Sequence, residues 1–263
     1  MWVRILVVMM LAAVLCGCAG DREQFTFVQM CDTQLGFGGY KEDVARFRQA
    51  VKQINALKPD FVVICGDLVN SATTKSFADF NDVKSGFAVP CHCAPGNHDV
   101  SNSPSSLKRY RELIGKDYFS FEHKGFTFVI ANSQMWKGGA SKETGAQDAW
   151  LKATLAAASQ KRHGIFLVVH QPLFVKDPDE KDEYYNIPLA KRRELLDLFK
   201  KHGVVAVLAG HTHKTMIQDY HGIQMVNGAT TSRNFDKRPF GFRLWHVGRK
   251  RPYKHEHVSL EMK

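Results

Sequence analysis

Polar side chains that can bind metal ions follow the apolar segments of this chain at the points where strands are expected to end. They combine carboxylate, amide and imidazole groups, whose oxygen and nitrogen atoms are metal ligands in proteins. Ligand sites in open α/β sheets form at the carboxyl ends of strands, where loops can converge without disturbing the core. The sequence therefore predicts one convergent metal site. Its five clusters are Asp32-Thr33-Gln34, Gly66-Asp67, Gly96-Asn97-His98-Asp99, His170-Gln171-Pro172 and Gly210-His211-Thr212-His213.

The ligand types indicate which metals would bind. Asp32 and Asp67 offer anionic oxygens. His170, His211 and His213 offer imidazole nitrogens. This mixture suits zinc, manganese or iron better than calcium or magnesium, which prefer oxygen ligands alone. The clusters hold more donors than one tetrahedral ion needs, and a shared carboxylate would let two ions sit roughly 3.5–4 Å apart.

Each cluster taken alone has an ordinary structural explanation. An aspartate after a strand is commonly a turn former or a helix N-cap, and Gly96-Asn97 suits a tight turn. A single histidine such as His170 is more often a hydrogen-bonded residue than a ligand. The pair His211 and His213 is more informative, because in an extended chain both rings would point the same way. Five such clusters at strand ends favour a shared site.

The pattern of apolar residues predicts the elements that position these clusters. Strand and helix segments alternate, which implies a parallel sheet flanked by helices, and a hairpin around His123-Lys124-Gly125 interrupts them. We expect one domain with two packed sheets and outer helices. The expected strands are 25–30, 61–65, 88–93, 118–122, 126–131, 165–169 and 204–209, then antiparallel 215–220, 223–226, 240–247 and 254–260. The expected helices are 40–57, 74–84, 107–114, 147–159 and 188–201.

In this order the clusters resemble the calcineurin-like metallophosphoesterase family, whose pattern is Asp-x-His, Gly-Asp, Gly-Asn-His-Asp/Glu, a lone His and Gly-His-x-His. The similarity covers nearly all of the chain after its first residues. It is closest to the branch with the calcineurin-like phosphoesterase domain-containing protein 1 type of phosphatase. Tyr184-Tyr185-Asn186 and Gly241-Phe242-Arg243 match that branch.

The resemblance implies a four-layer α/β/β/α sandwich of two mixed sheets flanked by helices. It also implies two divalent or trivalent metal ions, of manganese, iron or zinc, with Asp67 bridging them. His98 would sit beside the phosphate without binding metal, and Asp99 would orient its ring. The remaining ligands would be Asp32, Gln34 and His213 for one ion and Asn97, His170 and His211 for the other.

The expected function is that of a dinuclear phosphoesterase, with phosphomonoesters favoured and hydrolysis by a metal-bridging hydroxide. A phosphodiesterase or pyrophosphatase acting on nucleotides or envelope lipids is the alternative enzyme. A non-catalytic metal-binding envelope lipoprotein is the alternative of another class, although such a protein has no need for His98. Gln34 departs from the family, which mostly has histidine there, and a neutral amide predicts looser metal binding or a harder ion.

The first residues have the pattern of an export signal. Arg4 precedes the apolar run 5–15, and small residues follow. Leu15-Cys16-Gly17-Cys18 resembles a bacterial lipobox, which would place lipid on Cys18. We expect a signal peptide over 1–17, a tether over 18–24 and the metallophosphoesterase domain over 25–263, held at the cell envelope by the lipid.

The net charge of +10 does not distinguish a solvated basic surface from one that attracts anionic substrates or lipids, because lysine and arginine are scattered along the chain. A specific nucleic-acid partner would require a concentrated basic stripe and is not expected. The expected partner is a phosphorylated small molecule or phosphoprotein.

Three further segments leave alternatives open. Cys91-His92-Cys93 could suggest zinc, but alternation along a strand would turn His92 away from both cysteines. Residues 177–186 could overhang the site or form a surface loop. Arg233 could reach a phosphate, although a surface role is the plainer expectation.

Overall fold

The computed structural model describes residues 24–101, 103–138, 141–161, 163–248 and 250–262. The expected signal peptide, Cys18 and nearly all of the tether lie outside the described residues. Within the described ranges, no helix combines the length and apolar character needed to cross a membrane.

Two mixed β-sheets pack face to face. The five-stranded sheet has the order β11-β10-β1-β2-β3, with β1, β2 and β3 parallel and β10 antiparallel to β1 and to β11. The six-stranded sheet has the order β4-β5-β6-β7-β9-β8. The first sheet consists of β1 (Phe25–Met30), β2 (Phe61–Cys65), β3 (Cys91–Ala94), β10 (Gly241–Val247) and β11 (Lys254–Ser259). The second consists of β4 (Phe119–His123), β5 (Phe126–Ile130), β6 (Ile165–Val168), β7 (Val204–Ala209), β8 (Met216–Tyr220) and β9 (Ile223–Asn227).

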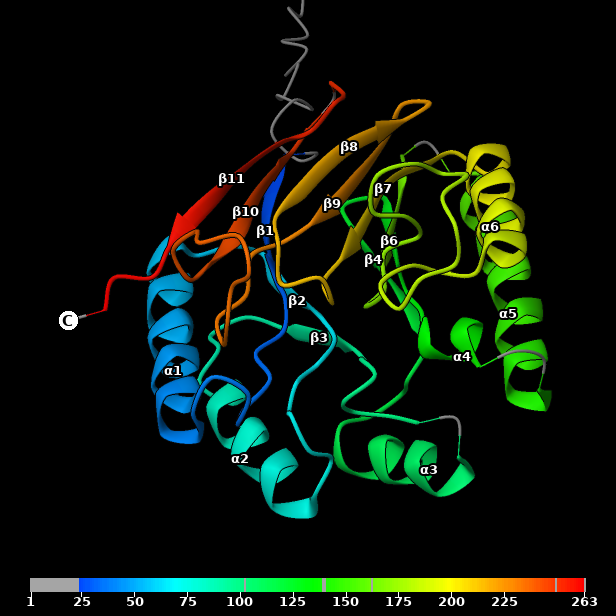
Figure 1. The fold of residues 1–263 in the computed structure, drawn as a ribbon. Coiled ribbons are helices and arrows are strands. Elements are labelled where there is room, and N and C mark those ends of the chain that lie inside the picture. The colour runs from blue at the N-terminus through cyan, green and yellow to red at the C-terminus, as the bar shows by residue number, and fades with distance from the viewer. Residues whose placement is uncertain (1–23, 102, 139–140, 162, 249, 263) are drawn as a thin grey trace, which may run out of the picture.

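Helices cover the two outer faces of the sandwich (Figure 1). One apolar cluster joins the first sheet to α1 (Tyr40–Leu57), α2 (Thr74–Lys84) and α3 (Pro104–Leu113). A second joins the other sheet to α4 (Gln134–Lys137), α5 (Lys142–Ala158) and α6 (Leu189–Lys201). The expected four-layer α/β/β/α architecture is therefore confirmed.

Aromatic rings fill the space between the sheets. Phe27 of the first sheet stacks on Trp245 with ring centroids 5.6 Å apart and meets Phe166 of the second sheet edge-on at 5.5 Å. All three side chains are fully buried. Such interdigitated packing resists sliding of one layer over the other, because a shift opens voids on both sides. The relative position of the two sheets is thereby set, and with it the position of the loops at their ends.

The structure differs from the expected elements at several places, including α3 and α5, which begin at Pro104 and Lys142 rather than at residues 107 and 147. β3 begins at Cys91 rather than at residue 88, because Pro90 has no N–H for the ladder and the Asn55 side chain binds the Ala88 N–H. The last four strands pair antiparallel as expected, β8 with β9 and β10 with β11, but β9 also pairs parallel with β7. The short helix α4 was not expected.

The loops that follow β1, β2, β6 and β7 meet at one end of the sandwich. Within the first sheet, Gln34 N–H donates to Asp67 O at 2.8 Å. Within the second, Gly210 N–H donates to His170 O at 3.0 Å. Across the sheets, His211 N–H donates to both carboxylate oxygens of Asp32 at 3.1 Å. Backbone hydrogen bonds thus tie the predicted clusters together within each sheet, and the Asp32 carboxylate ties them together across the two sheets.

Candidate metal centre

Two overlapping groups of metal-ligating atoms lie at this end of the sandwich. Asp67, His170 and His211 form one group, and Asp32, Asp67 and His213 form the other. Within each group the ligand atoms are within 4.8 Å of one another, and all five residues are buried. Asp67 belongs to both groups. The structure therefore brings together ligands from both sheets and from four of the five clusters.

Each histidine of these groups has one ring nitrogen bound to a backbone carbonyl. His170 Nδ1 donates to Cys65 O at 2.9 Å, and His211 Nε2 donates to Tyr184 O at 3.2 Å. His213 Nδ1 donates to the carbonyl of Arg233. These contacts fix the tautomer and leave the other nitrogen free to bind metal.

The free nitrogens face the cluster. His170 Nε2 lies 3.2 Å from Asp67 Oδ2, and His211 Nδ1 lies 3.1 Å from His170 Nε2. His213 Nε2 lies 3.5 Å from Asp32 Oδ1. Imidazoles oriented by outer hydrogen bonds, each with its second nitrogen turned toward the cluster, form a prepared cation site.

The two amide side chains are oriented in the same manner. Asn97 Nδ2 donates to Tyr184 Oη at 3.3 Å, while Asn97 Oδ1 lies 3.0 Å from His170 Nε2. Gln34 Nε2 donates to Asn70 Oδ1 at 3.4 Å. Gln34 Oε1 is buried and has no hydrogen-bond partner among the described residues. A buried carbonyl oxygen without a donor is costly unless it meets a cation, so this donor set fits metal ions.

The backbone at the ligands is strained. Positive φ is uncommon for residues other than glycine and costs on the order of 1–3 kcal/mol for each residue. Five of the predicted ligands adopt it: Asp32 at 48°, Gln34 at 34°, Asp67 at 49°, His211 at 69° and His213 at 51°. Such strain persists where surrounding packing determines the geometry, and its concentration here marks the site as functional.

Gly96 allows the Asn97 loop to approach the shared carboxylate. A Cβ atom at position 96 would lie 2.1 Å from Asp67 Oδ1 and 2.2 Å from Asp67 N. Both distances are shorter than real contacts, so any side chain there would push the loop away from Asp67. The close approach also lets His98 N–H donate to Asp67 Oδ1 at 2.9 Å.

Burial and neighbouring charges shift the pKa values of the buried ligands Asp67, His170 and His211. Burial opposes ionisation of Asp67, but the charge and hydrogen bond of His170 outweigh it and lower the Asp67 pKa to about 2. Burial likewise opposes the charge on His170, yet Asp67 and Asp32 raise its pKa to about 10. Burial, together with the charge on His170, lowers the pKa of His211 to about 3. Burial raises the pKa of Asp32, although the charges of His213 and His170 oppose this shift. The Asp67 carboxylate therefore attracts positive charge most strongly, and divalent cations would compete with the His170 proton for it.

The sequence pattern of the calcineurin-like phosphoesterases matches residues 25–215. The chain belongs to this family. It is a hydrolase of phosphoric esters, and its two overlapping ligand groups fit two divalent ions that share Asp67.

Relatives and solved structures support this assignment to the calcineurin-like phosphoesterases. The chain is 34% identical over 230 residues to the serine/threonine-protein phosphatase CPPED1 of Danio rerio, covering 77% of this chain and 74% of that protein. It is 27% identical over 219 residues to a probable glycerophosphodiester phosphodiesterase GpdQ of Arcobacter nitrofigilis, covering 78% of each. The fold matches a dimetal phosphatase structure from Danio rerio with a TM-score of 0.62, at 19% identity, over 90% of this chain and 99% of the other.

The expected contact between Asp99 and the His98 ring is not found in this phosphoesterase. His98 Nδ1 donates to Asn70 O at 2.9 Å instead. The Asp99 carboxylate accepts from the backbone N–H groups of Leu68, Val69 and Gly96. Asp99 therefore holds two ligand loops together and acts on His98 only through the backbone. Sequence adjacency was misleading because neighbouring side chains in a tight turn point in different directions.

A second expectation also fails in detail. His211 and His213 are not extended neighbours whose rings point the same way, because both have positive φ. The turn sends His211 to the group with His170 and sends His213 to the group with Asp32. One short segment thus serves both ligand groups.

Sequence reasoning missed the residues that support the ligands. Asn70 contacts both Gln34 and His98, and its position three residues after Asp67 was the available signal. Phe37 and Phe235 pack on His213, with ring centroids 5.2 and 5.0 Å away. Aromatic residues in loops carry no metal-binding pattern, so only the folded chain shows them beside the site.

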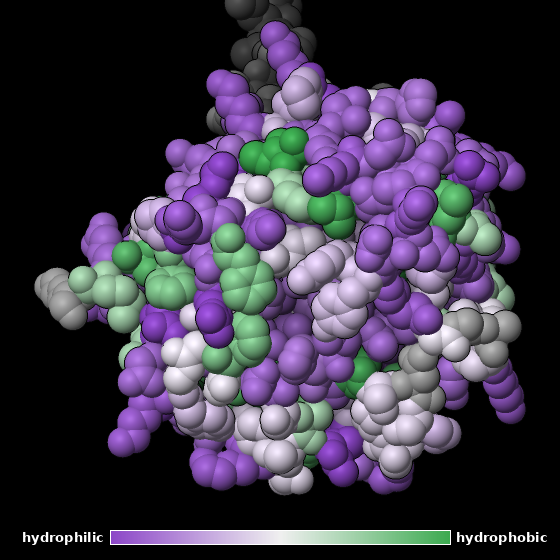
Figure 2. Space-filling model, viewed as in Figure 1, coloured by the Kyte–Doolittle hydropathy of each residue, from purple (hydrophilic) through white to green (hydrophobic). Residues whose placement is uncertain are grey.

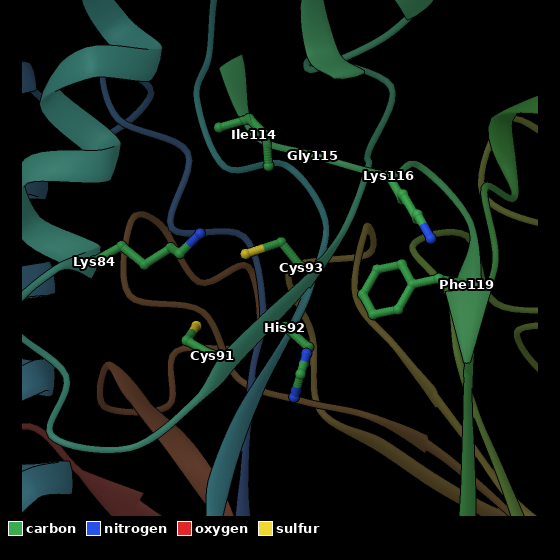
Figure 3. A pocket seen from close by; sticks show the side chains of 8 residues that line it. All are labelled: Lys84, Cys91, His92, Cys93, Ile114, Gly115, Lys116 and Phe119. Atoms are coloured by element: carbon green, nitrogen blue, oxygen red, sulfur yellow. The ribbon is translucent and has the colours of Figure 1, made fainter. Parts of the chain in front are cut away.

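A separate cavity of about 230 Å³ lies by β3 and contains Cys91 and Cys93 (Figure 3). The figure shows the His92 ring directed away from the two thiols, and this ring stacks on Phe121 with centroids 3.8 Å apart. The alternation expected from the sequence is therefore present. Within the described ranges, both groups of three or more metal-ligating residues lie at the phosphoesterase site, and none includes Cys91, His92 or Cys93.

We predict that Gln34→His binds metal more tightly than the wild-type protein. An imidazole is a stronger ligand for borderline divalent ions than a neutral amide oxygen. Titration of the metal-free protein with Zn²⁺ or Mn²⁺, followed by calorimetry, measures the affinity at each step. Gln53→His, at a half-buried position of α1 outside the ligand groups, is the matched control. Unchanged affinity and stoichiometry in Gln34→His would refute a ligand role for residue 34.

We predict that Asp99→Ala lowers the free energy of unfolding by about 2–4 kcal/mol, because it leaves buried backbone N–H groups of two loops without an acceptor. Urea unfolding of the metal-free protein measures this loss. Asp219→Ala, at an exposed position of β8, should change stability little. If Asp99→Ala unfolds like the wild type yet loses hydrolysis, Asp99 would act in catalysis and not in loop support.

Proposed function

We propose that the chain hydrolyses phosphomonoesters, with phosphoserine or phosphothreonine side chains as the leading substrate class. The observation that carries this proposal is the pair of ligand groups sharing Asp67, with the non-ligand imidazole of His98 fixed beside them. A relative named as a serine/threonine-protein phosphatase supports the substrate class. A purely metal-binding protein would gain nothing from a fourth imidazole that is oriented but lies outside the ligand groups.

Two divalent ions held here would supply Lewis acidity, which neutralises phosphoryl oxygens and makes water more acidic. One would be held by Asp32, Gln34, Asp67 and His213. The other would be held by Asp67, Asn97, His170 and His211. Asp67 is the only member of both sets, and its two oxygens are already aligned by His98 N–H and His170 Nε2.

His98 has the geometry of a proton donor. Its Nδ1 is bound to Asn70 O, which leaves Nε2 as the nitrogen that can exchange a proton with the substrate. Its backbone N–H donates to Asp67, so both the backbone and the ring of His98 are fixed next to the shared ligand. A protonated His98 can hydrogen-bond the phosphoryl group and protonate the leaving oxygen, the role of a general acid.

We predict that His98→Ala retains bound metal but loses about 10²-fold or more in kcat on an aryl phosphomonoester and a phosphoserine peptide, as expected for removal of a general acid. Asp67→Asn should lose both metal and hydrolysis. His221→Ala, in the exposed turn between β8 and β9, is the matched control. Metal analysis with kinetics on monoester and diester substrates separates the cases. A wild-type protein that binds metal and hydrolyses neither ester class would show a binding protein instead.

We also propose that the protein is exported and anchored to the bacterial cell envelope through lipid on Cys18. The basis is the order of Arg4, the apolar run 5–15 and the Leu15-Cys16-Gly17-Cys18 segment. The surface visible in Figure 2 is mainly hydrophilic, with small and separate apolar patches.

We predict that Cys18→Ser moves the protein from the membrane fraction to the soluble or secreted fraction of expressing bacteria and abolishes incorporation of labelled palmitate. Cys16→Ser is the matched control and should keep both, because only the residue at the cleavage site receives lipid. Equal labelling of wild type and Cys18→Ser would exclude this anchor.

A further inference from the structure

We propose that Arg233 binds the phosphoryl oxygens of the substrate and makes the site select phosphomonoesters over phosphodiesters. This inference rests on the proposed phosphoesterase function and adds to it a residue that sets the substrate class. It is carried by the way in which the loop of Arg233 is built onto the ligands and by the surroundings of its guanidinium group.

The backbone of this loop is tied to the ligands. His213 Nδ1 donates to Arg233 O, and Phe235 N–H donates to His213 O at 2.8 Å. Ser232 Oγ donates to Asp32 O at 2.8 Å. Two ligands of the same predicted metal ion therefore fix the loop on either side of Arg233, and the side chain starts from a defined position beside that ion.

A buried anchor on α1 holds the same loop from behind. Arg46 Nε donates to Thr231 O at 2.7 Å, and Arg46 Nη2 donates to Ser232 O at 3.1 Å. Its guanidinium also pairs with the fully buried Asp43. Because these contacts occupy the carbonyls before Arg233, the loop cannot move away from the site without losing charge-assisted hydrogen bonds.

The guanidinium of Arg233 lies near two aromatic rings. Its Cζ atom is 5.7 Å from the ring centroids of both Phe37 and Phe235. Both rings also pack on His213, and Phe37 approaches His98 at 6.4 Å. The rings thus connect the cation to one predicted ligand and to the predicted proton donor.

The hydrogen-bond donors of this guanidinium are uncommitted. Among the residues that the structure describes, no carboxylate pairs with it and no side chain or carbonyl accepts from it. The neighbouring Arg238 differs, because it pairs with Asp236 at 3.5 Å. Cation–π contacts hold a guanidinium by its face and leave its N–H edge free for an anion.

The chemistry of the esters decides what this edge would recognise. A guanidinium presents a planar fork of donors that matches two oxygens of a phosphate. A phosphomonoester dianion has three non-bridging oxygens and two negative charges. A diester has two such oxygens and a single negative charge, so it gains less from a third cation. Arg233 therefore contributes more to monoester than to diester hydrolysis.

The test compares metal-loaded wild type, Arg233→Met, Arg233→Lys and the control Arg238→Met on an aryl phosphomonoester and an aryl phosphodiester. We expect Arg233→Met to lower kcat/KM for the monoester about 10–100-fold, the range for a hydrogen bond to a charged group, and for the diester less than about 3-fold. Arg233→Lys should fall between, because it keeps the charge but not the fork. Arg238→Met should match the wild type on both esters.

A binding measurement provides a readout besides activity. Calorimetric titration of the metal-loaded proteins with inorganic phosphate should show affinity reduced about tenfold or more in Arg233→Met, at unchanged metal content. Equal losses on both esters, unchanged phosphate affinity, or loss of metal in Arg233→Met would each overturn the inference. A wild type that hydrolyses no monoester would instead refute the proposed function, so the two failures are distinguishable.

Discussion

The shared carboxylate of Asp67 is the constraint on which the rest of the site depends. It lies at the end of β2 in the first sheet, and His170, which follows β6 in the second sheet, contacts its Oδ2 at 3.2 Å. One carboxylate can serve both ligand groups only if the two sheets end side by side. The stacked aromatic rings between the sheets provide this registration, because their packing leaves no room for sliding.

The centre is prepared for cations at the expense of local conformational energy. Five predicted ligands have positive φ, and Gln34 Oε1 is buried without a donor in the part of the chain described. Surrounding hydrogen bonds offset this strain: backbone carbonyls accept from three imidazoles, and Asp99 accepts from the N–H groups of two loops. The loop of Arg233 is held in the same way, by hydrogen bonds to Asp32 and His213. Rigid outer contacts of this kind keep ligands and substrate groups in position without cost at the time of reaction.

Most of the fold could be predicted from the sequence. Apolar runs such as 61–65 and amphipathic periodicity such as that of 40–57 correspond to β2 and α1 with the expected bounds. The strand predicted over 88–93 begins later than expected, since Pro90 and the Asn55 side chain displace the start of β3. The pairing of β9 with β7 was not expected either, because strand neighbours depend on contacts between distant segments.

The sequence by itself determined which chemistry this protein could carry. Carboxylate, amide and imidazole groups at the ends of apolar runs specify a metal site, and their order specifies the family, since side-chain identity and strand periodicity are local properties. Only the tertiary structure decided how the groups divide the work. In the folded chain, the Asp99 carboxylate binds backbone N–H groups, and the His98 ring binds the carbonyl of Asn70. His211 and His213 belong to different ligand groups, and Arg233 lies beside the ligands. These assignments depend on left-handed backbone angles and on contacts between loops far apart in the chain, and neither is encoded in the spacing of residues.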